Sequence, residues 1–163
     1  MPEDNKKWSA PALTSKDLKK LLVRHKEAAR TLKGKGKYGL VVYHLGYVLE
    51  FALKACVCKH LGQPTYPKDD KGFFRVHSFP RLYMLSGLQD LFDRGKPHDS
   101  LYDSFTKEFL PFGDSWTNMR YDPKAQKRLS HGKLVKRMYN TLVGHGRSVS
   151  NSIIGIINKN NKW

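Results

Sequence analysis

Side chains able to move protons and hold phosphate lie in the last third of the chain. His145 stands between Arg137 and Arg147. Cleavage of a phosphodiester by a neighbouring hydroxyl needs a histidine as acid or base and a cation for the charge that develops on phosphate. Arginine suits the second role because its planar guanidinium matches phosphate oxygens. His145 is therefore the first candidate for the catalytic histidine, and His131, which lies close to Arg128, is the second.

The spacing of Arg137, His145 and Arg147 along the chain limits how they can form one site. Arg137 and His145 are two helical turns apart, about 12 Å along one helix axis, and Arg147 points about 160° away from His145. One site would therefore need a second chain of a dimer, or a helix break at Gly144 or Gly146. The alternative is that His145 is a hydrogen-bonded histidine of the core, because it falls on an otherwise apolar stripe.

A basic stretch precedes these residues and predicts contact with nucleic acid. Its cations could follow a phosphate backbone while a tyrosine stacks on a base. The alternatives are a solvated basic face, a structural role for Arg120 beside Trp116, or a footprint at Lys33, Lys35 and Lys37. The candidate binding residues are Arg120, Tyr121, Lys124, Lys127, Arg128, Lys133 and Lys136.

The composition agrees with a polyanion as the partner. The chain has 163 residues, with 30 Lys and Arg against 14 Asp and Glu, so its formal net charge is +16. A field of this sign attracts polyanions, of which nucleic acid is the most common. Aromatic residues make up 12%, which excludes a disordered basic tail and favours one folded domain.

The two cysteines and the start of the chain bear on the compartment. Cys56 and Cys58 cannot form a disulfide framework, and residues 1–11 have no apolar signal core, so we expect a cytoplasmic protein without a membrane span. Cys56, Cys58 and His60 resemble a metal motif. On a helix only Cys56 and His60 share a face, and two ligands do not complete a zinc site. We therefore expect no metal and no cofactor.

Hydrophobic periodicity predicts the elements that must position these groups. Apolar residues recur at helical spacing through most of the chain, and no convincing strand pattern appears. The sequence thus predicts an all-α fold, an antiparallel up-and-down bundle of four to five helices. Residues 1–13 form a polar arm, 14–158 one domain and 159–163 a basic tail. The expected helices run from Thr14 or Ser15 to Gly34, Tyr38 to His60, Ser78 or Pro80 onwards, Leu101 to Phe109, and Lys133 to Ile157.

The second of these helices carries the most specific motif. It reads YHLGYVLEFALKACVCKHLG and includes His44, Gly46, Glu50, Leu53, Lys54 and Ala55; His77-Ser78-Phe79 and Arg120-Tyr121 follow later. This order resembles the HEPN family (higher eukaryotes and prokaryotes nucleotide-binding) over most of residues 20–157. The resemblance implies a helical bundle that often dimerises. It also implies either a metal-independent endoribonuclease of a toxin–antitoxin or phage-defence system, or a non-catalytic module.

One departure from the family pattern separates these two hypotheses. Active members carry an Arg followed by a His after four to six residues, and no Arg–His pair in this chain has that spacing. The first hypothesis is an RNA-directed protein, and an endoribonuclease if a non-standard pair replaces the motif. The alternative is an interaction module that dimerises or binds a partner such as an antitoxin or a nucleotidyltransferase.

Overall fold

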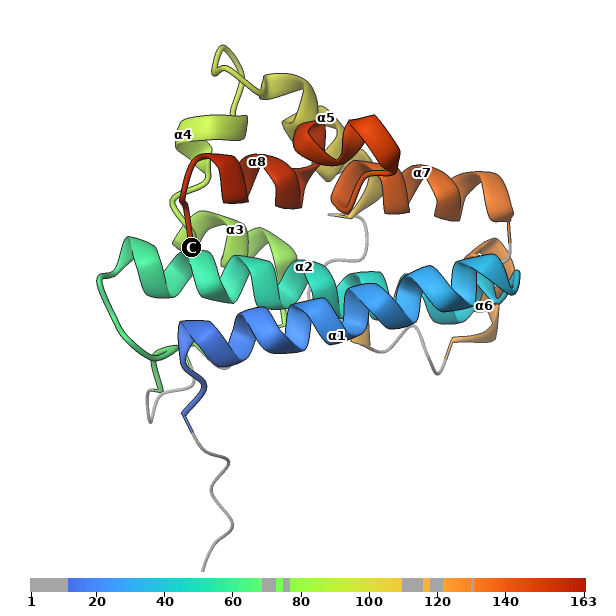
Figure 1. The fold of residues 1–163 in the computed structure, drawn as a ribbon, viewed down its shortest axis with the longest axis horizontal. Coiled ribbons are helices and arrows are strands. Elements are labelled where there is room, and N and C mark those ends of the chain that lie inside the picture. Colours follow the sequence, from blue (N-terminus) through green and yellow to red (C-terminus); the bar gives the residue numbers. More distant parts are fainter. Residues whose placement is uncertain (1–11, 69–72, 75–76, 110–115, 118–121, 130) are drawn as a thin grey trace, which may run out of the picture.

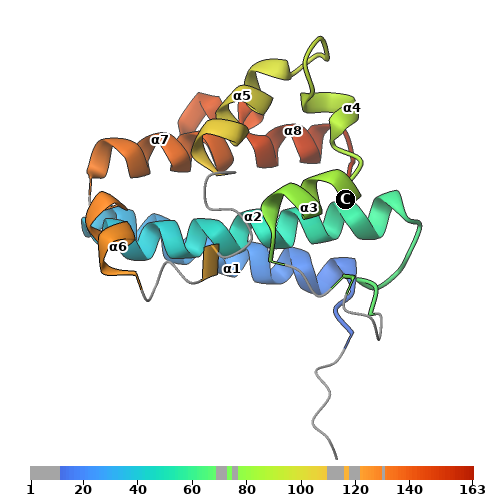
Figure 2. The same ribbon diagram turned by 180° about the vertical axis from the view of Figure 1, so that it is seen from behind.

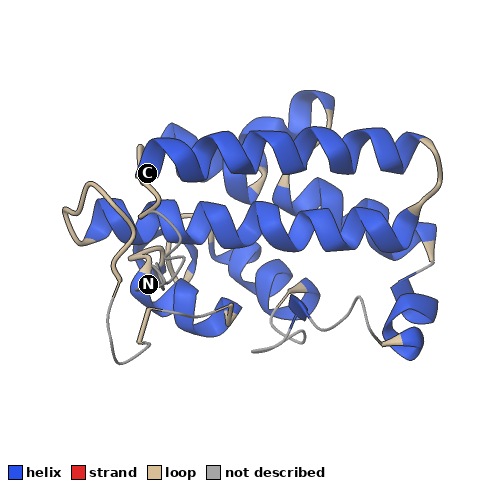
Figure 3. Ribbon diagram, turned by 90° about the horizontal axis from the view of Figure 1, so that it is seen from below, coloured by secondary structure: helices blue, strands red, loops and turns tan. Residues whose placement is uncertain are grey.

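The computed structural model describes residues 12–68, 73–74, 77–109, 116–117, 122–129 and 131–163. Within these residues the chain is all α, which confirms the predicted helical bundle; the one β feature is an isolated bridge between Thr14 and Thr65 (Figure 3). In chain order the helices are α1 (Ser15–Gly34), α2 (Tyr38–His60), α3 (Phe79–Leu85), α4 (Gln89–Phe92), α5 (Asp99–Glu108), α6 (Pro123–Leu129), α7 (Gly132–Leu142), the 3-10 helix η2 (Gly146–Asn151) and α8 (Ile153–Lys159).

Helices α1 and α2 form a long antiparallel pair (Figure 1). Thr14 caps α1: its hydroxyl oxygen accepts a hydrogen bond from the backbone N–H of Asp17 at 3.0 Å, and the Asp17 carboxylate accepts one from the backbone N–H of Thr14. The chain reverses through Gly36, which has a φ of +68°. Helix α1 begins at Ser15, one of the two starts expected from the sequence, and ends at Gly34 as expected.

Helix α2 is the central element of the bundle. It packs against α1, α3, α6 and α7, and its buried residues lie on nearly every side. Leu49 and Ala52 are completely buried. By length and apolar composition α2 also passes a test for a membrane span, with a mean hydropathy of 1.5, but 67% of that window is buried inside the fold. Core helices pass the same test, so cytoplasmic localisation stays a prediction.

The end of the chain differs from the prediction of one helix from Lys133 to Ile157. The chain leaves α7 at Val143, forms η2 and starts α8 only at Ile153. Gly144 has a φ of +78°, and a Cβ there would meet the backbone of Val149 at 2.5 Å. The Ser152 side chain then caps α8 by accepting from the N–H of Gly155. The prediction of one continuous helix is therefore wrong, because Gly144 ends one helix and Ser152 starts another.

Helix α3 packs against α2, while α4 and α5 lie farther out, with α5 against α7 (Figure 2). Ser78 caps α3, which begins at Phe79, between the two starts expected from the sequence, and α5 buries Phe105. Helix α6 was not predicted as a separate helix. Trp116 is 1% exposed, while Tyr121 lies outside the described residues. Trp163 packs against the bundle.

Candidate functional site

A buried carboxylate on α2 holds three side chains in one cluster, which we call the Glu50 centre. Glu50 is 2% exposed although it lies on the most apolar helix of the chain. Its Oε1 accepts a hydrogen bond from Lys54 Nζ at 2.7 Å. Its Oε2 lies 2.9 Å from His77 Nδ1 and 3.2 Å from Trp116 Nε1, which donates to it. The residues of this centre come from three separate parts of the sequence.

The donors keep Glu50 charged despite its burial. Burial alone would raise the pKa of Glu50, because it penalises the charged form. The hydrogen bond from His77 and the charge of Lys54 oppose this effect, and the net result is a pKa below the usual range. A carboxylate that accepts several hydrogen bonds in the interior fixes the positions of its donors.

Aromatic packing fixes the same centre from the side. A Cβ on Gly46 would lie 2.3 Å from the Trp116 ring, so glycine is required where the indole crosses α2. Phe79 stacks on Trp116 with ring centroids 5.6 Å apart and planes at 12°. Tyr47 meets the same ring edge-on at 4.8 Å. Four residues of the HEPN-like motif therefore lie together in this centre: Gly46, Glu50, Lys54 and His77.

His77 is the chemically versatile member of the Glu50 centre. Its side chain is 54% exposed, whereas that of Glu50 is 3% exposed. Since Nδ1 faces the carboxylate, this nitrogen carries a proton and Nε2 is left to exchange one. Among the described residues none forms a hydrogen bond with Nε2. A histidine oriented by a carboxylate through one nitrogen is the arrangement used for acid–base transfer at the other.

The remaining motif histidine forms a different pair. His44 Nδ1 on α2 lies 3.0 Å from His25 Nδ1 on α1, so one ring donates a proton and the other accepts it. Burial lowers the pKa of both histidines, and for His25 the charges of His44 and Arg24 add to this effect. The pair is therefore favoured in its neutral form.

A second feature is a basic end of the bundle, at the right of Figure 1, where α1 ends and α6 and α7 lie. Burial, together with the positive charge of Lys136 on α7, lowers the pKa of Lys33 on α1. Lys33 Nζ also lies over the Tyr139 ring at 3.9 Å. Lys33 of one footprint and Lys136 of the other, which the sequence left as alternatives, thus lie close together. We define the basic end as Lys33, Lys35, Lys37, Lys124, Lys127, Lys133 and Lys136.

For several lysines of the basic end, the described part of the chain supplies no acidic partner. Among the described residues no carboxylate forms an ion pair with Lys33, Lys35, Lys133 or Lys136. Lys35, Lys37, Lys124, Lys127, Lys133 and Lys136 are exposed. Arg120 and Tyr121, and the side chain of Arg128, lie outside what the structure describes.

The predicted catalytic residues occupy separate places. Arg137 donates to the buried carboxylate of Glu108 on α5 and has an anion as its partner. His145 was expected on an apolar stripe; it is instead exposed at the start of η2, where its backbone N–H donates to Ser148 Oγ. Arg147 is exposed on η2, and His131 is exposed immediately before α7. No described hydrogen bond joins any two of these four residues.

Among the described residues, no group of three or more His, Cys, Asp or Glu could hold a metal ion. Cys56 and Cys58 are both free and buried, and burial raises the pKa of Cys56 to about 12, which makes its thiol unreactive.

No protein-family model, curated protein or solved structure matches this chain. The likeness to HEPN proteins rests on the motif residues of the chain itself.

Two contacts of the site have little or no signal in the sequence. Glu50 is the one acid in the apolar helix α2, which is how a buried, paired carboxylate appears in a sequence, whereas Glu108 shares α5 with Asp99 and Asp103 and has no such signal. Their partners cannot be identified from spacing, because Trp116 is 66 residues from Glu50 along the chain and Arg137 is 29 residues from Glu108.

Proposed function

We propose that this protein is an RNA-directed, HEPN-like protein that binds RNA through the basic end. The observation that carries the proposal is the approach of Lys33 on α1 to Lys136 on α7, about 100 residues apart in the sequence, at the end of the bundle where α6 also lies (Figure 1). Like charges placed together destabilise a fold slightly unless a partner neutralises them. A polyanion releases its counterions on binding such a surface, which supplies most of the affinity.

Aromatic residues beside the lysines favour a single-stranded ligand. Tyr38 is half-buried and lies against Gly132, where α2 begins and α7 begins. Tyr139, whose ring Lys33 covers, is only 4% exposed, so Tyr38 is the ring at this end on which a base can stack. Single-stranded nucleic acid binds to surfaces that combine a basic track with rings on which bases stack. The HEPN resemblance favours RNA over DNA as that ligand.

The test is fluorescence anisotropy of a labelled single-stranded RNA over a series of KCl concentrations. We expect the double variant Lys33→Glu, Lys136→Glu to bind at least tenfold more weakly at low salt. The slope of log affinity against log salt should fall by roughly 0.7 for each phosphate group that the variant no longer neutralises.

A matched control has the same change of charge at the other end of the bundle. Lys16 near the start of α1 and Lys59 near the end of α2 are exposed, and the variant Lys16→Glu, Lys59→Glu changes the net charge equally. We expect it to bind RNA nearly as well as the wild type. Equal losses in the two variants would show that net charge alone attracts RNA, and the proposal would be wrong.

A second candidate function, metal-independent RNA cleavage, is favoured by the contact between His77 and Glu50. The buried carboxylate holds His77 Nδ1 at 2.9 Å and leaves Nε2 toward solvent, whereas His145 has no such support. We therefore assign the acid–base role to His77 in place of His145.

The variant His77→Asn tests this assignment, because the Asn amide N–H can replace Nδ1–H toward Glu50 without exchanging protons at neutral pH. With labelled RNA and a chelator present, we expect cleavage to fall by about 10²–10⁴ while the melting temperature stays near that of the wild type. His145→Ala and His131→Ala should cleave normally.

Loss of cleavage in His145→Ala or His131→Ala, with full activity in His77→Asn, would assign the acid–base role to the histidine whose variant lost activity. RNA binding without any cleavage would leave the binding function alone, and absence of both would favour a module that dimerises or binds an antitoxin or nucleotidyltransferase.

A further inference from the structure

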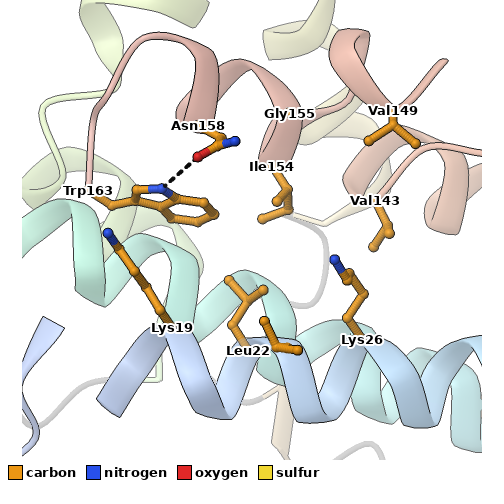
Figure 4. Close-up of a pocket in the computed structure, with 10 residues that line it drawn as sticks. Lys19, Leu22, Lys26, Val143, Val149, Ile154, Gly155, Asn158 and Trp163 are labelled. Atoms are coloured by element: carbon orange, nitrogen blue, oxygen red, sulfur yellow. Dashed lines mark hydrogen bonds between the residues drawn. The ribbon is translucent and has the colours of Figure 1, made fainter. Parts of the chain in front are cut away.

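A groove of about 330 Å³ lies between α1 and the end of the chain, away from both features described above (Figure 4). Its apolar floor includes Leu22 of α1, and Ile154 of α8 and Val149 of η2 face it from the other side. The indole of Trp163 crosses one end and donates from Nε1 to Asn158 Oδ1 at 3.4 Å. A volume of this size is within the range of small-molecule sites.

Two amines mark the charged character of the groove. Lys19 and Lys26 of α1 both line it, and in Figure 4 their Nζ atoms point up toward the α8 side. Lys19 Nζ lies 5.7 Å from the Trp163 ring centroid. Lys26 is half-buried and forms no ion pair with a described residue. No acidic residue lines the groove among the residues that the structure describes.

This combination selects the chemistry of the ligand. An apolar floor binds hydrocarbon, and an unpaired, partly desolvated amine favours an anion. Lys19 and Lys26 are seven helical residues apart, a rise of about 10.5 Å, comparable to an extended chain of about ten carbons. A second copy of this chain is a poor occupant, because it would place another strongly positive protein against two lysines.

We propose that the groove binds an amphipathic monoanion, an aliphatic carboxylate of the fatty-acid type. The carboxylate contacts Lys26, and the hydrocarbon chain lies over Leu22 and Ile154 with its end toward Trp163. This site is separate from the basic end and does not depend on RNA binding.

The test is isothermal titration calorimetry of the full chain with decanoate, below the concentration at which it forms micelles, and with 1-decanol in parallel. We expect saturable 1:1 binding of decanoate and at least fivefold weaker binding of the alcohol. Lys26→Gln should weaken decanoate binding roughly tenfold, as expected for the loss of a charged hydrogen-bond partner. Val149→Phe, at a position that is 48% exposed and tolerates a larger side chain, should fill the groove and abolish binding.

Lys20→Gln, on the exposed part of α1, is the matched control and should bind decanoate like the wild type. Equal affinity for decanoate and decanol, or unchanged binding in Lys26→Gln and Val149→Phe, would overturn the proposal. Binding of an acidic amphipathic peptide without any binding of decanoate would also overturn it, and would assign the groove to a protein partner. A dimer that Val149→Phe disrupts, again without decanoate binding, would assign it to a second copy.

Discussion

The Glu50 centre and the basic end differ in how their charges are placed. At the Glu50 centre a single buried carboxylate receives donors from Lys54, His77 and Trp116, and every partner has a fixed place. At the basic end, exposed lysines gather on one surface, and Lys33 and Lys136 are close enough to affect each other. Charges paired in the interior position side chains, whereas the charges of Lys33 and Lys136, which no described carboxylate pairs, leave binding energy for a ligand. Within one bundle, the Glu50 centre therefore holds the fold, and the basic end is the surface that we propose for binding.

The largest expected effect is at the Glu50 centre. Glu50→Ala leaves the donors of Lys54 and Trp116 without their partner, so we expect a loss of about 3–5 kcal/mol in the free energy of unfolding. Urea denaturation followed by circular dichroism measures this loss. Glu27→Ala, at an exposed position of α1, is the control and should stay within about 0.5 kcal/mol of the wild type. Equal stability of the two variants would mean that the centre does not hold the fold.

A smaller loss is expected where the Trp116 ring crosses α2. Gly46→Ala places a Cβ against that ring, and the indole must shift away from Glu50. Overpacking of this kind costs about 1–3 kcal/mol. Gly39→Ala is the matched control, since a Cβ there meets nothing within 4 Å, and we expect it to be as stable as the wild type or more so. A fully stable Gly46→Ala would contradict the close approach of ring and helix.

The part of the centre that lies within one helix was predictable, and the part that joins distant segments was not. The pair of Glu50 and Lys54 follows from helical spacing, and the cap of α1 follows from Thr14 and Asp17. The position of Trp116 over Gly46 depends on how a distant segment packs, which no local pattern records. The sequence also placed His145 in a helix, because the apolar spacing continues through the turn at Gly144.

The histidine pair between α1 and α2 offers a comparison with the paired acid of the Glu50 centre. Because the pKa values of His25 and His44 are lowered in the folded protein, the unfolded chain binds more protons below about pH 6.5. The free energy of unfolding should therefore decrease as the pH falls below about 6.5, through the lowered pKa values of the folded pair. Urea denaturation at a series of pH values, on the wild type and on His25→Gln with His44→Gln, measures this. An equally steep decrease in the double variant would place the titrating groups elsewhere.

The smallest expected effect on stability is at the basic end. Lys133→Gln together with Lys136→Gln removes two exposed like charges, so the free energy of unfolding should change by no more than about 0.5 kcal/mol. A slight gain is the expected direction, because Lys136 no longer opposes Lys33. Thermal denaturation at low salt checks it. A loss as large as that at the Glu50 centre would mean that these lysines serve the fold.

Lysine acetylation followed by mass spectrometry, with and without single-stranded RNA, tests the central claim most directly. The account predicts that RNA protects Lys35, Lys37, Lys133 and Lys136 from the reagent. Lys16, Lys20 and Lys59, which are equally exposed and lie away from the basic end, should react at the same rate with and without RNA. Protection spread evenly over both sets, or confined to the second, would contradict the basic end as the RNA-binding surface.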